Sequence, residues 1–180
     1  MNGKSYWVNA KKSGLYTQLL NSIIGQFDAV LSYHSKVHVL RFDLHQNAYT
    51  ENNKRLTIFN RRFFKWLKRQ YDLNRIGFVW VREHDQARQQ HYHYALMIDG
   101  HKVNHPLSIQ NKAVQVWADM NGYLFWPENP YYNVNRGDHD EIQQTIYRLS
   151  YLAKTRSKDK RPPQTKDIGT SRIKKHNQQY

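Results

Sequence analysis

Residues 76–98 have the sequence IGFVWVREHDQARQQHYHYALMI, in which two apolar stretches flank a polar segment. The first stretch, residues 76–84, and the second, residues 91–98, are rich in the β-branched and aromatic side chains that favour strands. The polar segment between them is short enough to join neighbouring strands. The pattern predicts an antiparallel hairpin, which ends at a turn formed by Asp99 and Gly100.

Helices and further strands are expected on both sides of this hairpin. Apolar side chains recur at helical spacing in four segments, and the last of these begins at Asp138, a favourable N-cap residue. The helices are predicted at residues 15–31, 54–71, 109–120 and 138 to about 155, and the other strands at residues 36–44 and near 131–134. This order predicts an α+β fold with a central, mostly antiparallel sheet of about four to five strands, flanked by helices.

The strand at residues 36–44 divides its side chains between two faces. Successive residues of a strand point to opposite sides of the sheet. One face is therefore predicted to carry His38, Leu40, Phe42 and Leu44, and the other Val37, Val39, Arg41 and Asp43.

The chain is long enough for one domain with its own core, which we expect to comprise residues 1–155. Residues 156–180 contain Pro162-Pro163, many Lys and Arg residues and few apolar side chains. Such a segment cannot bury enough apolar surface to fold by itself. We expect it to be a flexible basic C-terminal tail.

The charge of the chain favours a polyanionic partner. The 180 residues include 28 Lys and Arg against 14 Asp and Glu, a net charge of +14, and nucleic acid is the commonest polyanion. The absence of cysteine excludes disulfides, thiol nucleophiles and Cys-ligated metal sites. No apolar run approaches the ~20 residues of a membrane span, and the start of the chain lacks a secretory signal. A cytoplasmic protein without membrane contact is therefore expected.

The predicted helix at residues 54–71 carries a dense run of cations. This run has two interpretations: a solvated helix face, or a surface that follows phosphates. On the second interpretation, the nucleic-acid-binding residues are Arg61, Arg62, Lys65, Lys68 and Arg69.

A candidate metal site lies in the hairpin. His91 and His93 are two residues apart in one strand, so their imidazoles share a face. If Glu83 pairs opposite His91, its carboxylate points to that face as well. Two imidazoles and a carboxylate suit a divalent cation that keeps open positions for a substrate oxygen. His84 would replace Glu83 if the register slipped by one residue, and Asp43 with His45 forms a competing pair.

A second candidate site lies on the last helix, in the sequence YRLSYLAK at residues 147–154. Tyr147, Tyr151 and Lys154 fall on one face of a regular helix, beside its apolar stripe. Tyrosines at this spacing also occur at the edge of a core. A phenol can instead attack a phosphate and form a phosphotyrosine. Its ordinary pKa is near 10, so it needs a cation close by.

Together these motifs resemble those of the HUH endonucleases, most closely the two-tyrosine rolling-circle replication initiators of filamentous phages. The resemblance rests on residues 34–45 (HSKVHVLRFDLH), 76–98 and 146–154 (IYRLSYLAK). It implies a ferredoxin-like HUH fold over residues 1–155. It also implies that His91 and His93 bind the metal, with Glu83 at the position of a third, acidic ligand. Related mobilisation relaxases usually place their tyrosine before the histidines, whereas here it follows them.

The family implies a mechanism as well as a fold. Tyr151 matches the principal nucleophile, Tyr147 the second tyrosine and Lys154 the accompanying lysine, while Arg148 and Arg156 are expected to contact DNA. The expected function is metal-dependent nicking and joining of single-stranded DNA through a 5′-phosphotyrosine, which initiates rolling-circle replication. The implied cofactor is Mg²⁺ or Mn²⁺. The implied partners are single-stranded or cruciform origin DNA and, in a bacterial host cell, a helicase and a polymerase.

Two other functions agree with these observations. The first is a transposase or relaxase that uses the same chemistry. The second is a basic DNA- or RNA-binding protein without catalytic activity, in which the two motifs are inert.

Overall fold

The computed structural model describes residues 5–11, 13–84, 90–103, 105–154 and 165–176. Its helices are α1 (Thr17–Tyr33), α2 (Lys54–Tyr71), α3 (Leu107–Ala118), α4 (His139–Leu149) and the short 3-10 helix η1 (Ser150–Ala153). Its strands are β1 (Lys36–Gln46), β2 (Gly77–His84), β3 (Gln90–Asp99), β4 (Gly122–Phe125), β5 (Tyr131–Asn135) and β6 (Ile168–Thr170).

The strands form one sheet in the order β4-β1-β3-β2-β6, and all of its described pairings are antiparallel. The strand β5 also pairs with β1. Because β5 pairs with residues 36–40 of β1 and β4 with residues 43–46, these two short strands occupy successive stretches of the same edge. The central strands β1 and β3 are therefore buried between neighbours.

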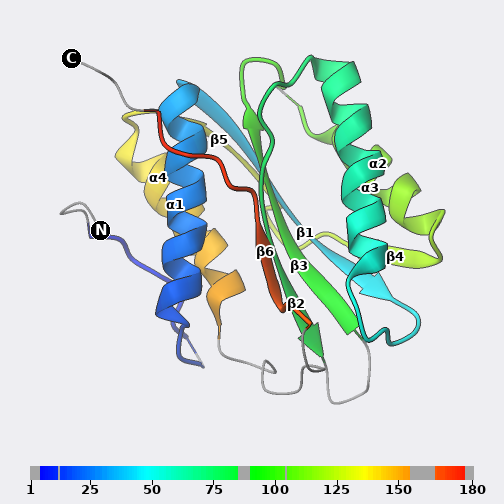
Figure 1. The fold of residues 1–180 in the computed structure, drawn as a ribbon. Helices are drawn as coiled ribbons and strands as arrows, with labels where there is room; N and C mark the ends of the chain where they lie inside the picture. Colours follow the sequence, from blue (N-terminus) through cyan, green and yellow to red (C-terminus); the bar gives the residue numbers. More distant parts are fainter. Residues whose placement is uncertain (1–4, 12, 85–89, 104, 155–164, 177–180) are drawn as a thin grey trace.

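Helices cover both faces of the sheet and create two cores (Figure 1). On one face, α1, α4 and η1 pack against Val37 and Val39 of β1. On the other face, α2 and α3 pack against Leu40, Phe42 and Leu44. The predicted division of this strand between two faces is thus confirmed, as is the predicted α+β class with an antiparallel sheet. None of the helices in the described residues is long and apolar enough to cross a membrane.

The C-terminal segment differs from the prediction. Residues 156–180 were expected to be a flexible tail, but β6 pairs with β2 and extends the sheet. Ser171 is buried, and its hydroxyl donates to Gln26 Oε1 of α1 at 2.7 Å. The tail prediction is therefore wrong for residues 165–176, because edge pairing and a few polar contacts hold a segment that is poor in apolar side chains. Residues 155–164 and 177–180 lie outside the described residues.

The last helix also ends earlier than predicted. The α-helix α4 stops at Leu149, η1 follows, and Lys154 is extended. The Ser150 hydroxyl donates to the carbonyl of Tyr147 at 2.7 Å, and Lys154 forms a β-bridge with Leu15. The N-terminal segment thereby draws the chain out of the α-helix, so residues 147, 151 and 154 do not share the face of one regular helix. The predicted N-cap is confirmed, because the Asp138 carboxylate accepts from the amides of Asp140 and Glu141.

We expect Gly169→Ala to destabilise the protein. Gly169 pairs with Trp80, and a methyl group at Gly169 would overlap the Trp80 indole. The variant should lose about 1–3 kcal/mol of unfolding free energy, measured by urea denaturation. As a control, Gly25→Ala in α1 meets no atom within 4 Å and should be neutral or stabilising by about 0.5–1 kcal/mol. A Gly169→Ala variant as stable as the parent would show that β6 does not rest against Trp80.

Candidate functional site

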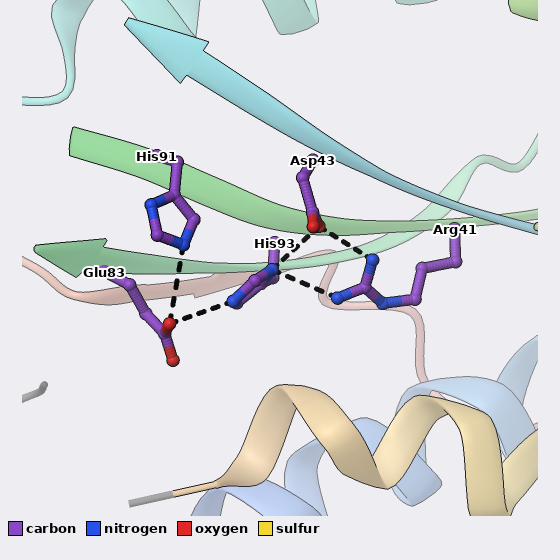
Figure 2. Close-up of polar contacts among 5 residues, drawn as sticks. All are labelled: Arg41, Asp43, Glu83, His91 and His93. Atoms are coloured by element: carbon purple, nitrogen blue, oxygen red, sulfur yellow. Dashed lines mark hydrogen bonds and ion pairs between the residues drawn. The ribbon is translucent and has the colours of Figure 1, made fainter. Parts of the chain in front are cut away.

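The hairpin brings Glu83, His91 and His93 together at one end of the sheet (Figure 2). Glu83 pairs with His91 across β2 and β3, as predicted, so the side chains of all three residues share a face. His93 Nε2 lies 3.0 Å from Glu83 Oε2, and His91 Nε2 lies 3.5 Å from the same oxygen. The two imidazoles therefore point their Nε2 atoms at one carboxylate oxygen.

His93 is held from its other side by β1. Its Nδ1 atom lies 2.7 Å from Asp43 Oδ1, and Asp43 pairs with His93 in the register of β1 and β3. Arg41 donates from Nη1 to the same Asp43 oxygen at 2.7 Å, and its Nη2 lies 3.0 Å from His93 Nδ1. Both Arg41 and Asp43 are buried. This arrangement fixes the plane of the imidazole and directs Nε2 toward Glu83.

The protonation of the cluster follows from these contacts. Burial raises the pKa of Glu83, but hydrogen bonds from His91 and His93 outweigh this effect and lower it to about 2. Burial likewise raises the pKa of Asp43, and the hydrogen bond from His93 and the charge of Arg41 bring it below its ordinary value. Burial lowers the pKa of His93, yet hydrogen bonds to Asp43 and Glu83 raise it overall. Two ionised carboxylates thus favour positive charge at His93 Nε2, whether from a proton or from a metal ion.

The donor set fits a divalent cation. The ligand atoms of Glu83, His91 and His93 all lie within 4.8 Å of one another. Two imidazole nitrogens and one carboxylate oxygen leave positions for water or a substrate oxygen. The contact of Asp43 with His93 Nδ1 is the carboxylate–histidine pairing that orients metal-binding imidazoles. These residues could therefore hold a metal ion with an outer shell in place.

The competing pair Asp43 and His45 does not form its own metal cluster among the described residues. Asp43 serves as the partner of His93. The imidazole of His45 stacks on His91 with ring centroids 5.0 Å apart, and on Tyr123 at 4.6 Å. The hairpin register leaves Glu83, rather than His84, paired with His91.

Tyr151 of η1 lies against the cluster. Its ring meets the His93 imidazole edge to face, with centroids 5.4 Å apart. The Arg41 guanidinium carbon lies 5.1 Å from the centre of the Tyr151 ring, and Lys154 Nζ lies 4.7 Å from it. The structure therefore brings together Tyr151, Lys154 and the histidines, which the sequence had identified in separate segments.

The other candidate residues of α4 are placed differently. Within the described residues, the Tyr147 side chain makes no ring contact or hydrogen bond with the cluster, and it is 36% exposed. Tyr147 lies in the last turn of α4, whereas Tyr151 belongs to η1. Arg148 points inward: its Nε and one Nη atom are buried without a hydrogen-bond partner in the described residues.

The predicted DNA-binding residues of α2 lie across the sheet from the cluster. Arg61, Arg62, Lys65, Lys68 and Arg69 are exposed, but α2 packs on the face of Leu40 and Phe42. The cluster occupies the opposite face, with Val39 and Val81. These cations therefore do not line the cluster. Arg156 lies outside the described residues.

Sequence reasoning missed how the site is supported, because it named Asp43 only in a competing pair with His45 and gave Arg41 no role in the site. Arg41 and Asp43 are charged positions in an otherwise apolar central strand, and that signal could have identified them as partners of a buried group. Nothing in the sequence of the N-terminal segment indicated that it supports the site. Its Asn9 amide donates to Ser150 Oγ at 2.8 Å, and the Tyr16 amide donates to the Ala153 carbonyl at 2.9 Å. These contacts hold η1 against the sheet.

Acid should weaken the protein through Glu83. Because the pKa of Glu83 is about 2 in the folded protein against 4.5 ordinarily, its contribution is present above pH 4.5 and is lost as the pH falls toward 2. Between pH 5 and pH 3, metal-free wild type should lose about 2 kcal/mol more unfolding free energy than Glu83→Gln. Urea titrations of both variants at the two pH values give this difference, in which the contributions of groups distant from Glu83 cancel.

The control for this measurement is Glu128→Gln, which changes an exposed glutamate. Its loss of stability between the two pH values should equal that of wild type. An equal loss in Glu83→Gln would contradict the hydrogen bonding of Glu83 to the two imidazoles.

Comparison with known proteins places the chain in a family. The family model described as the YagK/YfjJ C-terminal domain matches residues 2–171. The match extends beyond residue 155 and includes β6, in agreement with the paired C-terminal segment. Searches of curated proteins and of solved structures found no match. The chain therefore belongs to the YagK/YfjJ C-terminal domain family.

Proposed function

We propose that this protein nicks and rejoins single-stranded DNA through a covalent bond to Tyr151. The observation that carries the proposal is the contact of the Tyr151 ring with His93, at 5.4 Å between centroids. A phenol and an ammonium group from residues 151–154 meet a candidate metal site from the β2–β3 hairpin there. This combination suits phosphoryl transfer to tyrosine, because a phenol with an ordinary pKa is a weak nucleophile and needs activation by neighbouring groups.

The proposed step exchanges one phosphodiester for another. The Tyr151 oxygen attacks the phosphorus in line and loses its proton, while the bond from phosphorus to the 3′ oxygen breaks. The departing 3′ oxygen takes up a proton, which leaves a free 3′-hydroxyl and a 5′-phosphotyrosine. The bond energy is retained in the phosphotyrosine, so a second hydroxyl can reverse the exchange. A 3′-hydroxyl of this kind can prime a polymerase.

Three cationic side chains surround the position of the phosphate. Lys154 lies beside the Tyr151 ring, where its ammonium could pair with a phosphate oxygen. The charge of Arg148 acts on Arg41, whose guanidinium pKa is lowered by burial and by this neighbour, so the two guanidinium groups lie close together. The Nε and Nη2 groups of Arg148, which are buried and have no hydrogen-bond partner among the described residues, are suited to a non-bridging phosphate oxygen. These groups would stabilise the charge that develops on phosphorus.

Glu83, His91 and His93 would hold the metal ion of the reaction. A divalent cation bound there supplies Lewis-acid polarisation of a phosphate oxygen and a template for its orientation. The carboxylate favours Mg²⁺ or Mn²⁺, and the two imidazoles favour Mn²⁺ of this pair. His93 keeps its orientation through Asp43 and Arg41.

The resemblance to two-tyrosine initiators extends the proposal to rolling-circle replication. Tyr147, in the last turn of α4 and 36% exposed, would act as the second nucleophile that releases a closed circle. The substrate would be single-stranded or cruciform origin DNA, and a host helicase and polymerase would open and copy the duplex. The same transfer reaction also serves transposases.

Substitution of the two tyrosines tests the chemistry. With Mn²⁺ and a pool of single-stranded oligonucleotides, wild type should give a covalent adduct on a denaturing gel, and Tyr151→Phe should give none. Tyr147→Phe is the matched control and should still cleave. Mass analysis should locate the nucleotide on a peptide that contains residue 151. An adduct that persists in the double Phe variant would refute the assignment.

Metal binding provides an independent test. Titration with Mn²⁺, followed by electron paramagnetic resonance, should show one site in wild type and none in His91→Ala. Asp43→Asn keeps the shape of the outer partner but removes its charge, so the affinity should fall about tenfold. Asp72→Asn removes an exposed surface carboxylate and should leave the affinity unchanged. Equal Mn²⁺ binding by wild type and His91→Ala would contradict the site.

A further inference from the structure

Two large aromatic side chains beside the cluster are half exposed. Tyr123 and Phe125 of β4 are 49% and 54% exposed. They pair with His45 and Asp43 of β1, so both rings project from the face that carries His91 and His93. Apolar rings normally leave water when a covering element is near. Here the helical layer of this face leaves both rings accessible at the end of the sheet where the cluster lies.

The Tyr123 ring continues a row of stacked rings that begins in the cluster. His91 stacks on His45 with centroids 5.0 Å apart and planes 17° apart, and His45 stacks on Tyr123 at 4.6 Å and 12°. The row follows neighbouring strands from β3 through β1 to β4, which is the edge of the sheet. One face of the Tyr123 ring therefore rests on His45, and the other points away from the sheet edge. The stack holds the ring in a fixed plane.

A flat ring with one fixed face and one open face is a platform for another ring. Unpaired nucleobases stack on such platforms regardless of sequence. Alternate residues of a strand are about 7 Å apart, roughly twice the 3.4 Å spacing of stacked bases, so Tyr123 and Phe125 would each receive a separate base of an unstacked strand. A duplex keeps its bases stacked internally and cannot present them in this way.

We propose that Tyr123 and Phe125 form a stacking site for unpaired bases of the single strand whose phosphate occupies the cluster. The inference rests on the proposed function, which supplies the strand. The charge of +14 supports a nucleic acid over an apolar protein partner, and the buried guanidinium groups of Arg41 and Arg148 lie on the same face. The base next to the scissile phosphate would extend the row His91–His45–Tyr123 as its fourth ring.

The test removes the bases from the strand and the aromatic rings from the protein, separately and together, and compares the four affinities. Binding of fluorescein-labelled oligothymidylate, and of an abasic oligonucleotide of the same length, is measured by anisotropy in EDTA, so that no cleavage occurs. Wild type should bind oligothymidylate about tenfold more tightly than the abasic strand. Tyr123→Leu with Phe125→Leu keeps apolar side chains on the strand but removes the rings, and most of this preference should disappear. Binding to the abasic strand should be unchanged.

Tyr131→Leu is the matched control. Tyr131 is an exposed tyrosine of the edge strand β5 that also stacks on a histidine, His38, with centroids 5.7 Å apart. It pairs with Leu40 and therefore lies on the opposite face of the sheet. Its substitution should leave the base preference intact. Circular dichroism of each variant checks that the protein is folded. If the double variant does not fold, the single variant Phe125→Leu takes its place.

Three results would overturn the stacking site. In the first, wild type does not discriminate between the two strands. In the second, the variant with both Tyr123→Leu and Phe125→Leu keeps the wild-type preference. In the third, sedimentation shows that these substitutions change the oligomeric state instead. Failure of the nicking function looks different, because wild type would then form no adduct while its base preference persisted. Tyr151→Phe should lose the adduct and keep the preference.

Discussion

The double engagement of His93 is the interaction on which the site depends. Its two ring nitrogens face carboxylates from different neighbouring strands, Asp43 of β1 and Glu83 of β2. Only the observed registers of β1 with β3 and of β3 with β2 allow this, since a slip of one residue would turn each side chain to the other face. Charged groups in a buried strand cost desolvation energy, which the mutual hydrogen bonds offset only in part.

The sheet provides the histidines, whereas contacts between the N-terminal segment and η1 position Tyr151, the proposed nucleophile. Tyr151 reaches His93 because the N-terminal segment binds η1 through Asn9, Leu15 and Tyr16. If the α-helix continued regularly to residue 154, only the packing of α4 would hold these residues in place. The change to a 3-10 turn at Ser150 lets Lys154 extend toward Leu15 while its ammonium stays beside the Tyr151 ring. The geometry of the site is therefore a property of the whole domain.

Periodicity explains which features could be predicted. The strand period of two fixes which side chains share a face, so the alignment of Glu83, His91 and His93 followed once the hairpin was identified. The strands β4 and β6 carry too few residues for a pattern, and they exist because a longer strand offers them an unpaired edge. The end of α4 was missed for a related reason, because a distant segment competes for its last residues. The role of Asp43 depends on the pairing of β1 with β3, which local sequence does not specify.

The exposed cations of α2 and the candidate site lie on opposite faces of the sheet. The helix α2, which carries the exposed cations, packs into its core through Leu56, Phe59 and Phe63. The cluster lies on the other face of the sheet, which carries Val39 and Val81. A contribution to binding from α2 would be electrostatic and would weaken with salt, because it comes from solvated charges. Interactions at His93, Tyr123 and Arg148 involve buried or stacked groups, which salt screens far less. Because α2 and the cluster lie on opposite faces of the sheet, any affinity for DNA from α2 and the reactivity proposed for Tyr151 should be separable by substitution.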